Sequence, residues 1–458
     1  MSYNDFLRHP VTPRSTYRLE TVLGKLLWEC GRCVLQVAYN HLEPDDPQQM
    51  PRLLRSGLSD YRRNRKTRTT IATLFGHVSL RRFIYQAVEA GEAGIFPLQI
   101  ALGITAGQAT PALADVAGRL MADLPQQQTL AVLRERYGVR WSVGTLRKVI
   151  ASLAETLAPL REEAQVKYLV SLLQQAAQAT KNGRPSLVVG RDGIMIPMQR
   201  AWEEASTASI TVYDASGKRW GTTYLGCMPE AGQESMSQQL TQLLTGVLTA
   251  WKGPLPRLHY VTDAGYHPQD YFRTVLCRMR HPTTNARLRW TWSVDYFHAA
   301  ERITILAESL FGFTPAAKAW AEAQRKILKT KRNGALRVIQ AARALRRSRG
   351  LKRNRRKFDV ALGYLWKYRE HMAYSKYKRN GLPIGSGVTE AACKTIFTQR
   401  MKLSGMRWKN ISGQHVLDLR VILRGNIWET VRMSWLHHAR QPVTCNSTEF
   451  ATLAAKKR

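Results

Sequence analysis

The sequence predicts an α/β protein in which a mixed sheet with flanking helices is interrupted by a helical insertion and preceded by a mainly helical region. Strand-like runs alternate with helix-like runs between residues 185 and 305. Residues 306–380 have helical spacing and a strongly basic composition. The chain has 458 residues, more than one ordinary domain contains, so two or three domains are expected.

The N-terminal region, residues 1–180, is predicted to hold helices and one β-hairpin. Apolar residues recur at helical spacing over 15–45, so Cys30 and Cys33 are interpreted as buried helix positions rather than as a zinc site. The stretch 58–90 changes to alternating strands around a turn, which is typical of a hairpin. Its first strand carries the cations Arg62, Arg63, Arg65 and Lys66.

Residues 125–156 read as a helix, a turn and a second helix with Ser142 as its N-cap. The second helix would present Arg147 and Lys148 near its start. A helix-turn-helix protein places such cations against the major groove, whereas a plain helical hairpin leaves them solvated. Both interpretations stay open on the sequence alone.

The predicted order from residue 181 to 305 is three strands, helix, strand, helix, strand, which is the order of an RNase H-like core. The first strand, "SLVVGRDGIMIPM", is apolar on both sides of Asp192, so this charge must be buried, paired or used. Asp263 ends the fourth strand, "RLHYVTDAG". In an RNase H-like sheet these two positions are adjacent.

Two adjacent carboxylates repel each other, and a divalent cation between them removes the conflict. Glu390, on a helix that follows the Gly/Pro loop at 380–387, would complete an oxygen-rich site for two Mg²⁺ ions, with Mn²⁺ as a substitute. Each acid also has an ordinary structural role available. Asp192 could pair with Arg191, Asp263 could belong to a turn, and Glu390 could favour the start of a helix.

The charge of the chain points to a polyanionic partner. The formal net charge is +36, and 15 Lys or Arg but no acid lie between Arg325 and Lys357. Nucleic acid is the first candidate and an anionic membrane surface the second. No apolar run is long enough to span a membrane, no signal peptide is evident, and six cysteines form no disulfide framework, so a cytoplasmic protein is expected. The cations expected to contact phosphate in and after the insertion are Arg346, Arg347, Lys352, Arg353, Lys402 and Arg407.

Four motifs resemble those of bacterial insertion-sequence transposases of the DDE type, in the ISKra group and its Mutator-like relatives. The motifs are "RDGI", "VTDAGYHPQDYF", "SVDYFHAAER" and "PIGSGVTEAACKTIFTQRMKLSGMRW". The resemblance covers roughly residues 185–425 and is most specific in the last motif. It implies catalytic, metal-binding roles for Asp192, Asp263 and Glu390, and a supporting role beside the metals for Asp295 and His298.

Three assignments within the resemblance have alternatives. Asp295 and His298 could be only a structural hydrogen-bonded pair at the corner between a strand and a helix. Asp295 could replace Asp263 as a metal ligand, but the fold order and the family pattern both favour Asp263. Trp408 could stack on an unpaired base, or it could be a core residue beside a basic edge.

The resemblance further implies double-stranded DNA as the partner, both transposon ends and target, and a homo-oligomer on that DNA. The expected function is DNA cleavage and strand transfer. The same residues would suit an RNase H-like nuclease or resolvase without strand transfer, or a non-catalytic DNA-binding remnant. The expected domains are 1–180 for DNA binding, 181–305 for the first part of the core, 306–380 for the insertion, 381–430 for the part with Glu390, and 431–458 for the tail.

Overall fold

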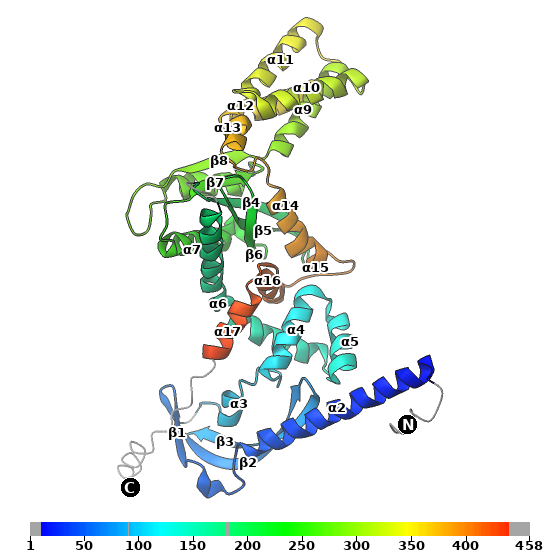
Figure 1. Ribbon diagram of the computed structural model, residues 1–458, viewed down its shortest axis with the longest axis vertical. Coiled ribbons are helices and arrows are strands. Elements are labelled where there is room, and N and C mark those ends of the chain that lie inside the picture. Colours follow the sequence, from blue (N-terminus) through cyan, green and yellow to red (C-terminus); the bar gives the residue numbers. More distant parts are fainter. Residues whose placement is uncertain (1–10, 90, 180–182, 439–458) are drawn as a thin grey trace. The chain divides into compact units, whose positions relative to one another are not determined.

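The computed structural model describes residues 11–89, 91–179 and 183–438 (Figure 1). The chain divides into two compact units, one of residues 1–157 with 432–458 and one of residues 158–431. Most of the tail expected at 431–458 lies outside the described residues. Among those described, no helix is both long enough and apolar enough to cross a membrane.

The first unit contains the predicted hairpin, extended by one short strand. Its three strands pair antiparallel in the order β1-β2-β3, and Gly76, with a φ of 90°, begins β3 directly after the turn. The strands and helices are β1 (Leu53–Ser56), β2 (Ser59–Thr73), β3 (Gly76–Ala87), α2 (Pro13–His41), α3 (Pro97–Ala101), α4 (Pro111–Asp123), α5 (Gln126–Tyr137) and the start of α6 (Val143–Gln178).

Helix α2 confirms the predicted helix, but the expected burial of its cysteines is wrong. Cys30 and Cys33 are both exposed. Only the opposite side of α2 faces the hairpin: Trp28 Nε1 donates a hydrogen bond to the carbonyl of Leu74 (3.1 Å), and Gln36 Oε1 accepts one from the Ser79 amide (3.0 Å). The hairpin covers this side of α2 only in part, since no residue of α2 is buried.

The helix–turn–helix element forms as predicted. Gly138 ends α5 in the left-handed region, with a φ of 61°, which suits a residue without a Cβ atom. Ser142 Oγ then accepts a hydrogen bond from the Thr145 amide (3.0 Å) and so caps α6. Arg147 and Lys148 are exposed on the first turns of α6.

The second unit is built on a mixed five-stranded sheet with the order β6-β5-β4-β7-β8. The strands are β4 (Ser186–Pro197), β5 (Trp202–Tyr213), β6 (Arg219–Cys227), β7 (Arg257–Thr262) and β8 (Trp290–Val294). The β4–β5 and β5–β6 pairs are antiparallel, whereas the β4–β7 and β7–β8 pairs are parallel. This confirms the predicted mixed sheet with flanking helices.

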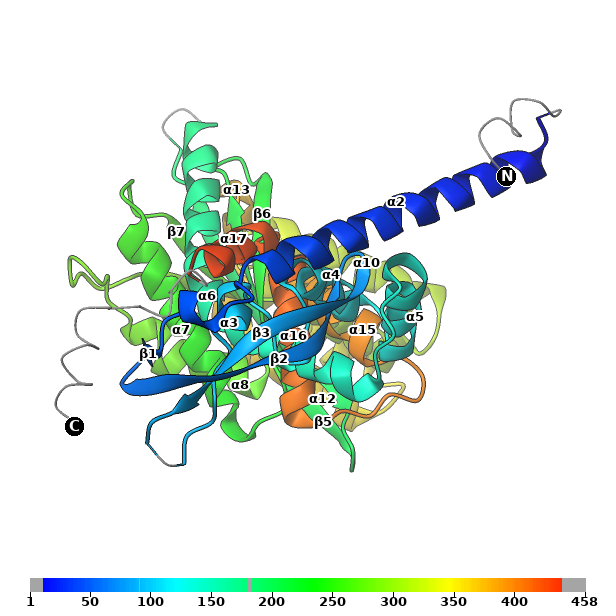
Figure 2. The same cartoon turned by 90° about the horizontal axis from the view of Figure 1, so that it is seen from below.

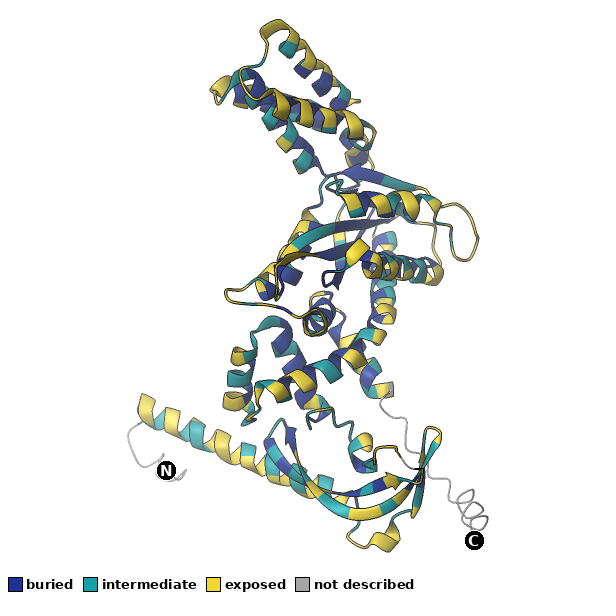
Figure 3. Ribbon diagram, turned by 180° about the vertical axis from the view of Figure 1, so that it is seen from behind, coloured by how far each residue is buried: buried dark blue, intermediate teal, exposed yellow. Residues whose placement is uncertain are grey.

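The two faces of the sheet are covered by different helices. Leu187 and Val189 of β4 belong to the main core with residues of α6 and α7 (Glu234–Ala250). Gly190 points to the other face, where α14 (Gly387–Ala392) and α16 (Asn410–Arg424) pack. Figure 3 shows the strands largely buried between these layers. Asp192, two residues after Gly190, is therefore on the α14 side.

A group of helices lies between β8 and α14, where the sequence predicts a basic helical segment. They are α9 (Tyr296–Phe311), α10 (Pro315–Thr330), α11 (Gly334–Arg349), α12 (Arg355–Tyr368) and α13 (Tyr374–Arg379). Their inward sides are apolar, with Leu328, Ile339 and Phe358 fully buried. Their cations are largely on the outward sides, which Figure 3 shows as exposed.

The remaining elements are short, apart from the last helix. They are the 3₁₀ turns Pro47–Gln49, Ala231–Gln233, Leu276–Arg278 and Arg369–His371, helices α8 (Tyr266–Thr274), α15 (Gln399–Met401) and α17 (Trp428–His438), and a π-helical segment, Cys393–Thr398. The π-helical segment directly follows α14, which carries Glu390. Such segments are frequent at functional sites.

Candidate metal centre

The pleat of β4 sends Arg191 and Asp192 to opposite faces of the sheet. Arg191 is 1% exposed, and its guanidinium donates to Ser237 Oγ (2.9 Å) and to Gln233 Oε1 (2.9 Å) beside α7. It is therefore engaged away from Asp192, and these contacts argue against the alternative in which the two residues pair.

Asp192 is half-buried, and its carboxylate accepts two hydrogen bonds. Its Oδ1 accepts a hydrogen bond from the Gly193 amide (2.8 Å), and its Oδ2 accepts one from the Cys393 thiol (3.3 Å). Burial raises the pKa of Asp192, and the negative charge of Asp263 raises it further. The repulsion anticipated from the sequence is thus present in the structure.

Asp263 follows β7 in a tight turn in which Ala264 has a φ of 67°. Its Oδ1 accepts a hydrogen bond from the Gly265 amide (2.8 Å), and a Cβ atom on residue 265 would stand 3.1 Å from that same oxygen. The main-chain carbonyl of Asp263 accepts a hydrogen bond from the Tyr364 hydroxyl of α12 (3.0 Å). The turn is consequently fixed from two sides.

Asp295 is fully buried at the start of α9. It caps this helix by accepting from the amides of Phe297 and His298, the latter at 3.1 Å. Burial alone would raise the pKa of Asp295, but the nearby His298 imidazole and the hydrogen bonds donated by Ser386 and by the His298 amide outweigh it and lower the pKa to about 2. The carboxylate is therefore ionised at neutral pH.

His298 lies one turn into α9 beside Asp295. Its Nδ1 is 3.5 Å from Asp295 Oδ1, the distance of an ion pair rather than of a well-directed hydrogen bond. The Asp295 carboxylate raises the pKa of His298 to about 9 in spite of burial. Without a metal ion the imidazole is accordingly a cation at neutral pH.

Ser386, at the N-cap position of α14 and not among the predicted site residues, joins Asp295 to Glu390. Its Oγ lies 2.6 Å from Asp295 Oδ2 and 2.9 Å from Glu390 Oε1. One hydroxyl hydrogen serves only one of these acceptors at a time, so the two carboxylates compete for it. A cation between the carboxylates would relieve the competition.

The ligand atoms of Asp295, His298 and Glu390 all lie within 4.8 Å of one another, so this group could hold a metal ion. The predicted set of Asp192, Asp263 and Glu390 shares Glu390 with it, but its ligand atoms are not all this close together among the described residues. The two sets are adjacent, because Glu390 belongs to both and Cys393, three residues after Glu390, donates to Asp192 Oδ2 (3.3 Å).

Cys393 is the second residue that sequence reasoning missed. Its thiol is buried, and its pKa is raised above the usual range by burial and then by the charges of Asp192, Glu390 and Asp263. It stands three residues after Glu390, so the helical spacing placed both side chains on one side of the chain. That spacing was the available signal.

Among the cations expected to contact DNA, most are exposed and some already bind other groups of the chain. The exposed cations are Arg62, Arg65, Arg147, Lys148, Arg347, Lys352, Arg353 and Arg407, and Lys402 is half-buried. Arg63 donates to main-chain carbonyls of Pro47 and Met50, Lys66 lies 3.0 Å from Asp45, and Arg346 lies 2.6 Å from Asp359. These three, and also the exposed Arg147, which donates to Gln126 Oε1 (3.2 Å), already have partners within the chain.

Trp408 is a core residue, so the expectation that it stacks on a base is corrected. It is 8% exposed, and its indole Nε1 donates to the carbonyl of Met401 (2.8 Å). Its main chain pairs with β4, because its amide donates to the carbonyl of Pro197 (3.1 Å). A buried ring with its only donor satisfied cannot offer a face to DNA.

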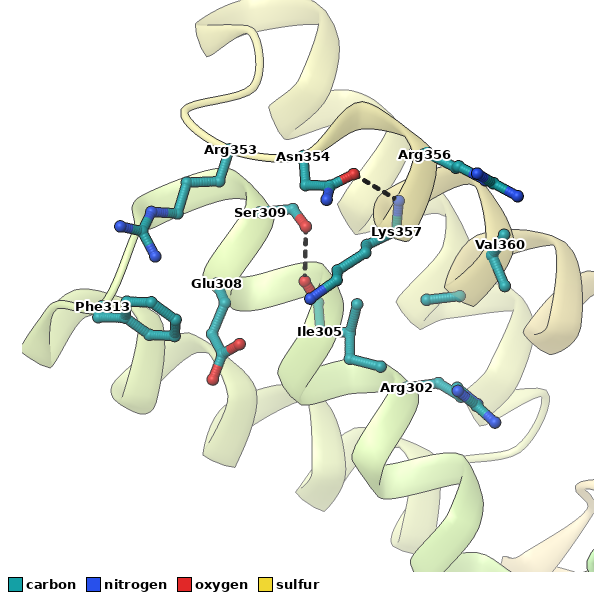
Figure 4. Close-up of a pocket in the computed structure, with 11 residues that line it drawn as sticks. Arg302, Ile305, Glu308, Ser309, Phe313, Arg353, Asn354, Arg356, Lys357 and Val360 are labelled. Carbon is teal, nitrogen blue, oxygen red and sulfur yellow. Dashed lines mark hydrogen bonds between the residues drawn. The ribbon is translucent and has the colours of Figure 1, made fainter.

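A cationic cavity of about 800 Å³ opens between α9 and α12 (Figure 4). Arg302, Arg353, Arg356 and Lys357 line it, together with one acid, Glu308. At its edge the Arg353 guanidinium lies 4.3 Å from the centre of the Phe313 ring, which is 72% exposed. Such a surface suits a ligand with phosphate groups and a flat apolar part.

Comparison of the sequence with protein-family models and with curated proteins finds no match.

Proposed function

We propose that this chain is a DDE-type DNA transposase, which binds the terminal repeats of an insertion sequence and catalyses metal-dependent DNA cleavage and strand transfer. The observation that supports the proposal is the parallel register of β4 and β7, in which Gly190 pairs with Val261, so that Asp192 and Asp263 follow at matching positions, while the helix of Glu390 packs on β4. The three acids come from β4, the end of β7 and α14, and the thiol of Cys393, three residues after Glu390, donates to Asp192 Oδ2 (3.3 Å). Three acids gathered in a chain of net charge +36 are suited to phosphoryl transfer on a polyanion.

The topology supports an RNase H-like catalytic domain. The first strand of the unit, β4, lies next to the fourth, β7, and their parallel pairing brings the carboxylates of Asp192 and Asp263 to the same region. The helices α9–α13 would then be the insertion between this sheet and the helix of Glu390.

The chemistry of the ligands favours Mg²⁺, with Mn²⁺ as a substitute, for the set of Asp192, Asp263 and Glu390. All three offer carboxylate oxygens, which Mg²⁺ prefers, whereas the set with His298 offers a nitrogen that suits transition metals better. Two divalent ions would supply activation of the attacking hydroxyl and neutralisation of the leaving oxygen. Protonated His298, held by Asp295, would contact the phosphate as a cation.

Helix α9 connects the carboxylates to the cationic cavity. It begins with Asp295 and His298 and continues to Arg302 and Ser309 at the cavity, a path of about 16 Å from His298 to Ser309 at the rise of an α-helix. A DNA strand with its reacting phosphate at the carboxylates would reach the cavity within a few nucleotides. The cavity would therefore grip DNA that flanks the cleavage site.

The proposal is tested by a strand-transfer assay with Mg²⁺ and DNA from the regions that flank the reading frame. Joined products are expected from the wild type, and none from Asp192→Asn, Asp263→Asn or Glu390→Gln, while DNA binding survives. Asp270→Asn, which changes an exposed acid on α8, is the matched control and should remain active. Cleavage without joining would instead identify a nuclease, and binding without turnover a DNA-binding remnant.

Ion binding separates the two possible ligand sets. In a calorimetric titration with Mn²⁺, Asp192→Asn should lose binding if the three carboxylates hold the ions, while His298→Ala should retain most of it. The reverse result would assign the site to Asp295, His298 and Glu390. Glu390→Gln weakens binding in both cases and confirms that the measured ions occupy this region.

A further inference from the structure

Helix α2 carries an exposed apolar stripe on the side that faces away from the hairpin. Its members are the half-buried Leu19 and the exposed Leu23, Leu26, Cys30, Cys33 and Val37, at alternating spacings of four and three residues, with the exposed Leu27 and Val34 alongside. We call these eight residues the α2 seam. Figure 2 shows the N-terminal half of α2 extending away from β2 and β3.

The α2 seam is open to solvent to an extent that is unusual for so many large apolar side chains. The exposed fractions are 52% for Leu23, 64% for Leu26, 63% for Leu27, 59% for Val34 and 70% for Val37. No residue of α2 is buried. A contiguous exposed apolar patch of this kind marks an interaction surface.

The spacing identifies the kind of partner. Apolar residues that alternate by four and three repeat every 3.5 residues on average, which is the period of helices that pack along their length. A helix with this period needs a partner helix of the same period. A second copy of this chain supplies one, because it presents an identical seam.

The charges of α2 are compatible with such pairing. The net charge of +36 would drive two copies apart, but the cations of α2 avoid the seam. Arg18, Lys25 and Arg32 stand seven residues apart, and Arg14 precedes Arg18 by four, so all four lie along another side of the helix. Two helices can therefore meet through the seam without placing cations against each other.

The surface of the seam is sufficient for a weak dimer. A fully exposed Leu or Val side chain carries on the order of 100 Å² of apolar surface, so the five measured residues leave about 300 Å² exposed on each helix. With the polar margins that accompany apolar contacts, two helices would bury about 1,000 Å² in total, which is the lower bound of a specific interface.

We infer that two copies of this chain associate through their α2 seams, as a pair of helices packed along the 3.5-residue repeat. The association does not require DNA or metal and is thus independent of the proposed catalytic function. The micromolar range is expected for the dissociation constant because the interface is small.

Sedimentation velocity of the full chain, after nuclease treatment and at about 1 M salt, tests the inference, since charge-mediated bridging by DNA is screened there over a Debye length of ~3 Å. The wild type should show a monomer–dimer equilibrium. Leu26→Glu should raise the dissociation constant at least tenfold, and Leu26→Ala should raise it less. Tyr17→Glu, which alters an equally exposed apolar residue outside the seam, should leave it unchanged.

Two results would overturn the inference: a wild type that stays monomeric throughout the micromolar range, or a Leu26→Glu variant that dimerises like the wild type. Leu26 is largely exposed, and an unchanged circular dichroism spectrum establishes that its variants fold. A bismaleimide crosslinker should join two copies through Cys30 and Cys33. Crosslinked dimers that persist in Cys30→Ser with Cys33→Ser would place the contact elsewhere.

Discussion

Gly190 of β4 lies directly against Thr389 of α14. A Cβ atom on residue 190 would stand 1.8 Å from Thr389 Oγ1 and 3.0 Å from Thr389 Cβ. The hydroxyl of Ser209 on β5 holds the same threonine hydroxyl at 2.7 Å. Because Glu390 follows Thr389, this close approach of helix to strand sets the position of Glu390 relative to Asp192.

Gly190→Ala should therefore displace α14 and with it Glu390. We expect a loss of stability of about 1–3 kcal/mol, as for other overpacked sites, and a loss of Mn²⁺ affinity. The control is Gly363→Ala on α12, where an added Cβ meets nothing within 4 Å. This variant should gain slightly in helix stability. Thr389→Ala in the Gly190→Ala background should restore part of the stability and part of the Mn²⁺ affinity. A Gly190→Ala variant that binds Mn²⁺ normally would contradict the prediction.

Cys393→Ala should weaken ion binding by about tenfold or more, a size typical of residues that orient metal ligands. The thiol donates to Asp192 Oδ2, and this hydrogen bond opposes the rise in the pKa of Asp192 that burial and Asp263 cause. Cys393→Ser keeps a donor and should bind almost normally. Cys227→Ala removes another buried thiol, so unequal ion affinities of the two alanine variants separate the local effect from general destabilisation.

His259 should make the stability of the protein depend on pH. It is fully buried on β7, where its Nε2 lies 3.1 Å from the carbonyl of Pro383, and burial lowers its pKa from 6.5 to about 4. The unfolded chain binds a proton at higher pH than the folded chain. The contribution of His259 to the free energy of unfolding is therefore complete above pH 6.5. It is lost as the pH falls towards 4, by roughly 3 kcal/mol at most.

Urea unfolding at pH 7.5 and pH 5 measures this dependence. His259→Gln should be less stable at pH 7.5 but should lose less stability on acidification than the wild type does. His41→Gln, which changes an exposed histidine on α2, should keep the slope of the wild type. Parallel slopes for the wild type and His259→Gln would assign the acid sensitivity to other groups.

Arg347→Ala combined with Lys352→Ala should weaken DNA binding and reduce its dependence on salt. Both residues are exposed, and each phosphate contact contributes about 0.9 to the slope of log affinity against log salt, so a reduction of up to ~2 is expected. Lys167→Ala, an exposed cation on α6 paired with Glu163 (2.6 Å), serves as the control. A double variant with an unchanged salt slope would exclude the outward side of α11 and its following loop from the DNA contact.

The elements of the fold were predictable where local signals agreed. The hairpin, the Ser142 cap and the strand of Asp192 all follow from alternation, capping chemistry and flanking polar residues. Cys30 and Cys33 were misjudged because helical periodicity shows which residues share a side but not which side the fold covers. Trp408 was undecided for the same reason, since its burial depends on pairing with Pro197 on a distant strand.

The acids of the candidate site could be proposed from the sequence, but their arrangement and hydrogen-bond partners could not. Asp192, Asp263 and Glu390 were chosen through a resemblance and a strand order. That Ser386 would bridge Asp295 to Glu390, or that Cys393 would donate to Asp192, depends on the approach of α14 to β4. Contacts between residues some 90 or 200 positions apart have no local signal.

Arg191 and Asp192 point to opposite faces of the sheet, so the number of residues that precede them in β4 decides which charge faces which side. Deletion or insertion of one residue before Arg191 would exchange the two charges across the sheet. A guanidinium would then stand among the acids and repel any divalent ion, while a carboxylate would be stranded beside Gln233 and Ser237 in the apolar layer. Conservative substitutions at the core positions Leu187 and Val189 are consequently more tolerable than a change in the length of β4 before Asp192.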